Sequence, residues 1–374
     1  MKSDNLITNR QFISLASAFF LGNALAVTGG INASEKTGHI TILISFILYT
    51  LLCFIYKRIF TKCETSDIFG ICVQFFGVAF EKLIYVAVFI YSIFTAVISS
   101  VEFLFFVEAS SDFSLNPLLI SFIFAVAVFL ILLCGKKALA RYSELILPFV
   151  LGIIAFVFIF GVKKMNFQNL IPSNFPKISE LSKEVSISFL SPFSNILLIY
   201  FFVSDMFTKK TIQKGSICAG LISLAVIMAV YIANLTVIGK NLMNSLYFPA
   251  LYTFSVINPE IFTERSETVF FTTYIFLDIL YTACAYFVAT DLCGRIFSKK
   301  NTPPKKIRKV FLVIPSLLSF AVMALAPDIE TFRSSLKTVP FILSVITLGI
   351  PVIFYVLSLF RDNLPHKTKN NPLQ

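Results

Sequence analysis

The residue best placed for chemistry in this sequence is Asp278, a carboxylate at the centre of a long apolar segment. An ionisable side chain inside a membrane span costs on the order of 2.5–3.5 kcal/mol on insertion scales, so such residues usually serve a function. Tyr274 and Thr282 lie one helical turn before and after Asp278, so the three polar side chains share one helix face. We therefore expect this face to contact a ligand, an ion or a proton. The alternative is an interhelical hydrogen bond that only fixes packing.

A second acidic residue, Glu102, follows Tyr91, Thr95 and Ser99 at helical spacing in another apolar segment. This stripe is also expected to face the interior of a helix bundle, with Ser99 and Glu102 as candidate ligand contacts. Glu102 lies toward the outer end of its segment. Its side chain could therefore reach the membrane interface instead of a binding site.

The elements that position these residues are membrane helices. The chain has 374 residues, of which 57% are hydrophobic and 14% are charged, a composition outside the range of soluble domains. The sequence predicts an all-α membrane protein whose single polytopic domain covers residues 1–374, with about ten transmembrane helices. The expected spans are residues 11–31, 38–56, 83–106, 117–134, 140–161, 185–207, 216–238, 267–289, 310–326 and 339–360, followed by a tail at 361–374.

The basic residues indicate the orientation of these spans. With the N-terminus in the cytoplasm, most of the 31 Lys and Arg residues fall in inner loops, so we expect both termini and the tail to be cytoplasmic. The loop at residues 295–309 would lie inside and the loop at 239–266 outside. The net charge of +11 is thus explained by a membrane topology, and no nucleic-acid partner is expected.

Two spans contain helix-breaking residues. The first carries Gly22-Asn23 and then Thr28-Gly29-Gly30, which indicate either an interruption that offers backbone groups to a ligand or close helix packing. The sixth carries an interruption at residues 191–195, where a proline removes a backbone donor. Interruptions in spans one and six predict five-plus-five inverted repeats. The expected ligand-binding residues are Gly22, Asn23, Thr28, Gly29, Gly30, Ser99, Glu102, Pro192, Phe193, Ser194, Asn195, Tyr274, Asp278 and Thr282.

Other polar residues indicate structure instead of chemistry. Arg141 and Glu144 lie three residues apart at the start of the fifth span, and we expect them to form a structural ion pair. The two histidines, His39 and His366, lack plausible partners, and no phosphate-binding loop, nucleophile arrangement or Cys/His ligand spacing is present. We therefore expect no catalytic residues, no metal and no cofactor, and a binding or transport protein instead of an enzyme.

Four stretches carry a resemblance to a known family. They are ITNRQFISLASAFFLGNALAV at 7–27, GKKALARYSELILPF at 135–149, MNFQNLIPSNF at 165–175, and FPALYTFSVINPEIFTERSETVFFTTYIF at 248–276. Together they resemble the B subunit of spore germinant receptors, the endospore germination permease family, within the amino acid–polyamine–organocation transporter superfamily. Gly135 and Arg141 match the family's pattern before the fifth span, whereas Asn195 stands where the family often has an acidic residue.

The resemblance implies a permease-like sensor in the inner membrane of a dormant spore. It would bind a small nutrient such as an amino acid, act with an A subunit and a C-type lipoprotein, and trigger germination. Two alternatives remain at this point, a proton- or sodium-coupled amino acid transporter and a scaffold that holds partner subunits.

Overall fold

The computed structural model describes residues 6–27, 38–63, 67–111, 116–171, 177–179, 181–182, 184–185, 192–204, 206, 209–257, 267–297, 305–335 and 339–360. Within these ranges every regular element is a helix. The main helices are α1 (Asn9–Val27), α2 (Gly38–Lys62), α3 (Ile68–Ser110), α4 (Pro117–Cys134), α5 (Lys136–Gly161), α7 (Ile196–Val203), α8 (Lys209–Val237), α11 (Glu267–Phe297), α12 (Lys305–Ala324) and α14 (Val339–Phe360). The shorter elements are η2 (Val162–Lys164), η3 (Phe167–Leu170), η4 (Phe193–Asn195), α9 (Gly239–Ser245), α10 (Pro249–Ile257) and α13 (Ile329–Ser335).

Helix length and composition confirm an all-α membrane protein. Among the described residues, 6 helices are long and apolar enough to cross a bilayer, and they correspond to the predicted spans two, three, four, five, seven and eight. Three shorter apolar helices, Phe193–Val203, Val313–Ala324 and Ile346–Leu359, fall at spans six, nine and ten. Helix α1 occupies the place of span one.

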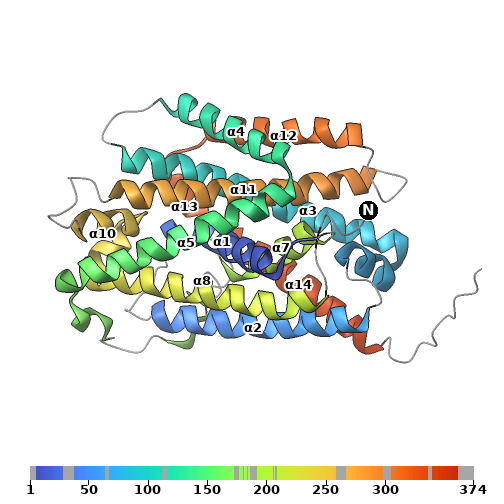
Figure 1. The fold of residues 1–374 in the computed structure, drawn as a ribbon, viewed down its shortest axis with the longest axis horizontal. Coiled ribbons are helices and arrows are strands. Elements are labelled where there is room, and N and C mark those ends of the chain that lie inside the picture. The colour runs from blue at the N-terminus through green and yellow to red at the C-terminus, as the bar shows by residue number, and fades with distance from the viewer. Residues whose placement is uncertain are drawn as a thin grey trace, which may run out of the picture.

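Most long helices run side by side along the longest axis of the molecule (Figure 1). Helices α3 and α11 pack together through the middle, with α1 and α7 beside them. Helices α4 and α12 pair as one outer layer, and α2 and α8 pair on the opposite side. Helix α10 lies at one end, and α11 runs from there to the end at which α14 finishes. The two loops predicted to face opposite sides thus adjoin opposite ends of the bundle, and the side that faces the cytoplasm stays a prediction.

Helix α1 corrects one expectation about the first span. It is helical from Asn9 to Val27, so the chain is not interrupted at Gly22-Asn23. Gly22 instead lets α1 approach α11 closely, because a Cβ added there would lie 2.5 Å from Tyr281 Cβ and 2.9 Å from the Leu277 carbonyl oxygen. The packing interpretation therefore fits Gly22. Thr28, Gly29 and Gly30 lie outside the described residues.

Helix α8 uses glycine in the same way against two other helices. A Cβ at Gly215 would lie 2.5 Å from Cδ1 of Phe12 in α1, and a Cβ at Gly220 would collide with the Tyr49 ring of α2. Small residues let helix backbones approach closely where apolar lipid supplies no hydrophobic drive for association. These aromatic–glycine contacts hold α1 and α2 close to α8.

The sixth span is irregular where the sequence indicates. Pro192 forms a turn, Phe193–Asn195 form the 3₁₀ turn η4, and α7 begins at Ile196. Residues 186–191 lie outside the description, as does the polar tail at 361–374. The described part of this span is therefore a short helix preceded by non-helical backbone.

Several helix bounds differ from the expected spans. Helix α3 extends back to Ile68 through a kink at Gly77, where φ is +72°, a backbone conformation that glycine adopts easily. Helix α5 begins at Lys136, directly after Gly135 with φ of +88°, and α11 continues to Phe297. Helices α4 and α14 have the expected bounds.

Candidate functional site

Asp278 lies at the centre of α11 and is completely buried. Ser99 Oγ of α3 donates a hydrogen bond to Asp278 Oδ1 at 2.5 Å, and Ser99 Oγ is 2.9 Å from Thr282 Oγ1, one turn further along α11. The second carboxylate oxygen, Oδ2, has no hydrogen-bond partner among the described residues. The Oδ1 atom of this carboxylate is therefore hydrogen-bonded by a hydroxyl, and its Oδ2 atom has no such partner in the described region.

The Tyr274 hydroxyl, one turn before Asp278, is the second unsatisfied group. Its side chain is completely buried and its oxygen has no hydrogen-bond partner in the described part of the chain. The Phe106 ring of α3 lies over it, with 4.0 Å between ring centroids. Because buried polar groups in proteins are nearly always hydrogen-bonded, two such groups within one turn of α11 mark a place suited to a polar partner.

Asn195 connects the irregular part of the sixth span to α3 and α11. Tyr91 of α3 donates to Asn195 Oδ1 at 2.5 Å, and Asn195 Nδ2 donates to the Tyr281 hydroxyl at 3.1 Å. The Ser194 Oγ also lies 3.4 Å from the Tyr91 hydroxyl. These buried bonds fix η4 between the two helices that carry Ser99 and Asp278.

Helix α1 reaches the same region through Tyr281. Gly22 packs on the Cβ of Tyr281, and the Phe19 ring lies 4.6 Å from the Tyr281 ring between centroids. Asn23 follows Gly22 on α1, and its backbone continues the helix. The structure thus brings α1, α3, η4 and α11 together, as the sequence predicts for spans one, three, six and eight.

Glu102 is buried on α3, one turn after Ser99. It interacts electrostatically with the Tyr274 and Tyr281 hydroxyls of α11. A second acidic group therefore lies beside the Asp278 face.

Two of the expected ligand contacts point elsewhere. Phe193 is buried against α2, with its ring 5.2 Å from Tyr49 and 5.9 Å from Phe46 between centroids. Pro192 is also buried, and it starts the turn that leads into η4. These two residues shape the irregular segment and pack it on α2, while Ser194 and Asn195 face α3 and α11.

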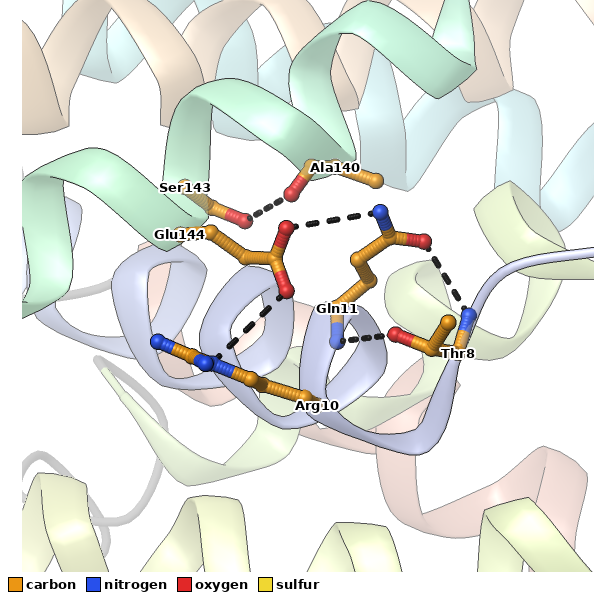
Figure 2. Close-up of polar contacts among 6 residues, drawn as sticks. All are labelled: Thr8, Arg10, Gln11, Ala140, Ser143 and Glu144. Atoms are coloured by element: carbon orange, nitrogen blue, oxygen red, sulfur yellow. Dashed lines mark hydrogen bonds and ion pairs between the residues drawn. The ribbon is translucent and has the colours of Figure 1, made fainter.

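The expected ion pair between Arg141 and Glu144 is replaced by contacts to α1. Figure 2 shows Glu144 Oε2 accepting a hydrogen bond from Gln11 Nε2 at 3.3 Å and Glu144 Oε1 at 3.9 Å from Arg10 Nε. Thr8 and Gln11 also bond each other's backbone amides, which caps the start of α1. Arg141 is exposed on α5. A neighbouring helix supplies the partner of Glu144, which the local spacing of residues cannot reveal.

A buried ion pair that the sequence does not predict joins α5 and α11. Lys136 Nζ lies 2.5 Å from Asp291 Oδ2, with side-chain exposures of 9% and 11%. The same ammonium lies 5.3 Å from the centre of the Phe202 ring of α7. In the sequence, Asp291 lies near the inner end of a predicted span. An acidic residue is expected there because its side chain can reach the membrane–water interface. The available signal was a lysine just before the inner end of the fifth predicted span and an aspartate just after the inner end of the eighth.

Comparison with known proteins shows the family to which this chain belongs. Residues 6–331 match the family described as spore germination protein. The chain belongs to this family. A relative in it is spore germination protein KB of Bacillus subtilis (strain 168), which is 22% identical over 371 residues, covering 97% of each chain. The chain is thus a permease-like germination protein of the germinant receptor B type, as the resemblance predicts.

The fold is similar to that of a solved transporter. A Na⁺-coupled sialic acid symporter, in a substrate-bound outward-open state, matches 96% of this chain and 80% of its own chain with a TM-score of 0.64. The two sequences are 12% identical, so the likeness concerns the fold alone. A transporter-like fold of this kind is consistent with the predicted five-plus-five arrangement.

Proposed function

We propose that this germination protein senses a small nutrient, an amino acid, by binding it between α1, α3, η4 and α11. The observation that carries the proposal is the completely buried Asp278, whose Oδ2 atom has no hydrogen-bond partner among the described residues. A bare carboxylate in a bundle interior is unfavourable unless it is protonated or paired. An ammonium group of a ligand satisfies both its charge and its free oxygen.

The surrounding groups match the other parts of an amino acid. The Tyr274 hydroxyl, one turn from Asp278, offers a donor to a ligand carboxylate, and it too is unsatisfied in the described region. The Phe106 ring beside Tyr274 supplies an apolar wall for a side chain. Helix α1, which packs on Tyr281 of α11 through Gly22 and Phe19, would close the remaining side of the site.

Binding transmits a signal only if the ligand prefers one conformation of the bundle over another. The hydrogen bonds of Asn195 to Tyr91 and Tyr281 join the irregular segment to both helices of the site. A ligand at Asp278 would thereby bias the position of η4 and α7. We propose that an A subunit and a C-type lipoprotein read this change in the spore inner membrane, with both termini of the chain in the cytoplasm.

A coupled amino acid transporter is the second candidate, and the likeness to a Na⁺-coupled symporter favours it at the level of the fold. Uptake of labelled amino acid into proteoliposomes that contain this chain alone would support the transporter. Variants that lose germination without losing uptake in vegetative cells would support the sensor.

The test of the proposal is the substitution Asp278→Asn in spores that carry normal amounts of the protein. It keeps the shape and one oxygen of the side chain but removes the charge. We expect the nutrient concentration for half-maximal germination to rise at least about tenfold, equivalent to roughly 1.4 kcal/mol. The control is Glu330→Gln, which neutralises an exposed carboxylate on α13. An unshifted dose–response curve for Asp278→Asn would mean that this residue only holds helices together, and Glu102 would become the candidate.

A further inference from the structure

A cavity of about 580 Å³ opens away from the central site, where α3 and α12 end and where α4 and α13 begin. Small-molecule sites in proteins measure roughly 300–1,000 Å³, so the cavity is large enough for a ligand. None of its described lining residues is among those around Asp278. It is therefore a separate feature of the molecule.

The cavity has an apolar floor and an acidic mouth. Leu104 and Phe105 of α3 and Met323 of α12 line it and are buried. Glu108 and Asp328 line it and are exposed, whereas none of the described lining residues is basic. Apolar atoms inside and two carboxylates outside fit a molecule with an apolar body and a positively charged end.

Local hydrogen bonds keep the mouth of the cavity negatively charged, and a ring contact fixes the position of its wall. Asp328 caps α13, because its Oδ2 accepts from the Thr331 amide at 3.0 Å and its Oδ1 accepts from Thr331 Oγ1 at 2.7 Å. These bonds hold the pKa of Asp328 below its usual value, so it is anionic at neutral pH. The Phe332 ring lies 5.5 Å from Phe105, which anchors α13 on α3.

We propose that this cavity binds a small organic cation with an apolar body, such as a protonated primary amine that carries an aromatic or aliphatic group. The whole chain has a net charge of +11, which repels cations at long range, so attraction must come from the local carboxylates. The apolar body contacts Leu104, Phe105 and Met323, and the ammonium lies between Glu108 and Asp328. Because Leu104 and Phe105 lie between Glu102 and Phe106 on α3, the cation adjoins the helix that supports the central site.

The experiment measures binding of 2-phenylethylammonium to the purified full chain in lipid nanodiscs by calorimetry. The neutral 2-phenylethanol has a similar apolar body and serves as the matched ligand. We expect saturable binding of the cation that is clearly tighter than binding of the alcohol. The double variant Glu108→Gln, Asp328→Asn should weaken the cation about tenfold and leave the alcohol unchanged. Asparagine also caps helices well, so α13 is retained.

Two controls locate the binding. Glu330→Gln removes a negative charge from α13 outside the cavity lining, and it should leave the affinity for the cation unchanged. Ala324→Phe adds a ring to the lining and should abolish binding of both ligands. Equal affinities for cation and alcohol, no saturable binding, or unchanged affinity in the double variant would each overturn the proposal. Binding that is lost in Asp278→Asn and kept in the double variant would place the cation at the central site instead. This result would overturn the cavity proposal without contradicting the proposed function.

Discussion

Helix α11 carries two buried aspartates in different surroundings. Asp291 lies 2.5 Å from the ammonium of Lys136. Asp278 instead accepts a hydrogen bond at Oδ1 from the Ser99 hydroxyl, and its Oδ2 has no hydrogen-bond partner among the described residues. The two residues share a helix and an apolar setting. They differ in whether the protein itself supplies the opposite charge.

This difference separates a structural carboxylate from a binding carboxylate. A buried ion pair holds two helices in register, because removing either partner leaves an uncompensated charge. A carboxylate without a cation is retained in a membrane bundle when it meets an ion, a proton or a ligand. The comparison therefore predicts that Asp291 governs stability and that Asp278 governs the response to nutrient.

The largest expected effect follows from breaking the pair of Lys136 and Asp291. Lys136→Met should lower the free energy of unfolding by about 3–5 kcal/mol, because Asp291 is then buried without its cation. Asp278→Asn should leave the free energy of unfolding nearly unchanged. Denaturant titration of the purified chain in detergent measures both.

A rescue variant serves as the control for this prediction. Asp291→Leu combined with Lys136→Met removes both charges and should restore most of the stability, since an apolar pair can replace a buried ion pair. If Lys136→Met is no more destabilising than Asp278→Asn, the proposed division between the two aspartates fails.

Gly22→Val tests how α1 contributes to the central site. The added side chain collides with Tyr281 Cβ and the Leu277 carbonyl oxygen, so we expect a loss of about 1–3 kcal/mol of stability from overpacking. Protein level and nutrient response should fall together. The matched control is Gly152→Val on α5, where an added Cβ meets no atom within 4 Å. A weaker response at normal protein level would instead favour direct contact between the Gly22 backbone and the ligand.

Ser99→Ala probes the support of Asp278 from α3. The change removes the hydrogen bond to Asp278 Oδ1, so we expect a loss of about 1 kcal/mol in stability and a shift of the germination curve in the direction of Asp278→Asn. Ser92→Ala is the matched control, because Ser92 Oγ donates to the Phe89 carbonyl of its own helix. Equal effects of the two variants on the germination curve would show that Ser99 does not position Asp278.

The smallest effect concerns an exposed carboxylate, Asp328. Its pKa is below the usual value because Thr331 donates two hydrogen bonds to it, so the charged form stabilises the start of α13. This contribution is complete above the pKa of an unfolded aspartate and is lost as the pH falls through the lower folded value. Hydrogen exchange of the Thr331 amide should accelerate over that acidic range. Asp328→Asn should make the exchange independent of pH there, after correction for the intrinsic rate.

The sequence predicts the helices well where local signals mark their ends. Pro117 at the start of α4 and Gly135 after its last residue set bounds that match the expected span. Asp278, Tyr274 and Thr282 share one face because helical periodicity alone determines it. The kink at Gly77 was missed, because an isolated glycine in an apolar stretch does not reveal a positive φ.

Pairings between helices were the part that could not be predicted. Glu144 has a potential partner three residues away, yet it contacts Gln11 and Arg10 of α1, since the packing of α1 on α5 decides the outcome. The same holds for Lys136 and Asp291, which are far apart in sequence. Polar residues inside spans can be recognised from the sequence, but their partners depend on tertiary contacts.

The aromatic–glycine contacts have a consequence for genetics. At Gly22, Gly215 and Gly220 even the methyl group of alanine meets a neighbouring side chain, so there is no small replacement for any of them. A selection for spores that fail to germinate would therefore recover alleles at these glycines alongside alleles at Asp278. Only a measurement of protein abundance for each allele separates residues that recognise the nutrient from residues that let the bundle assemble.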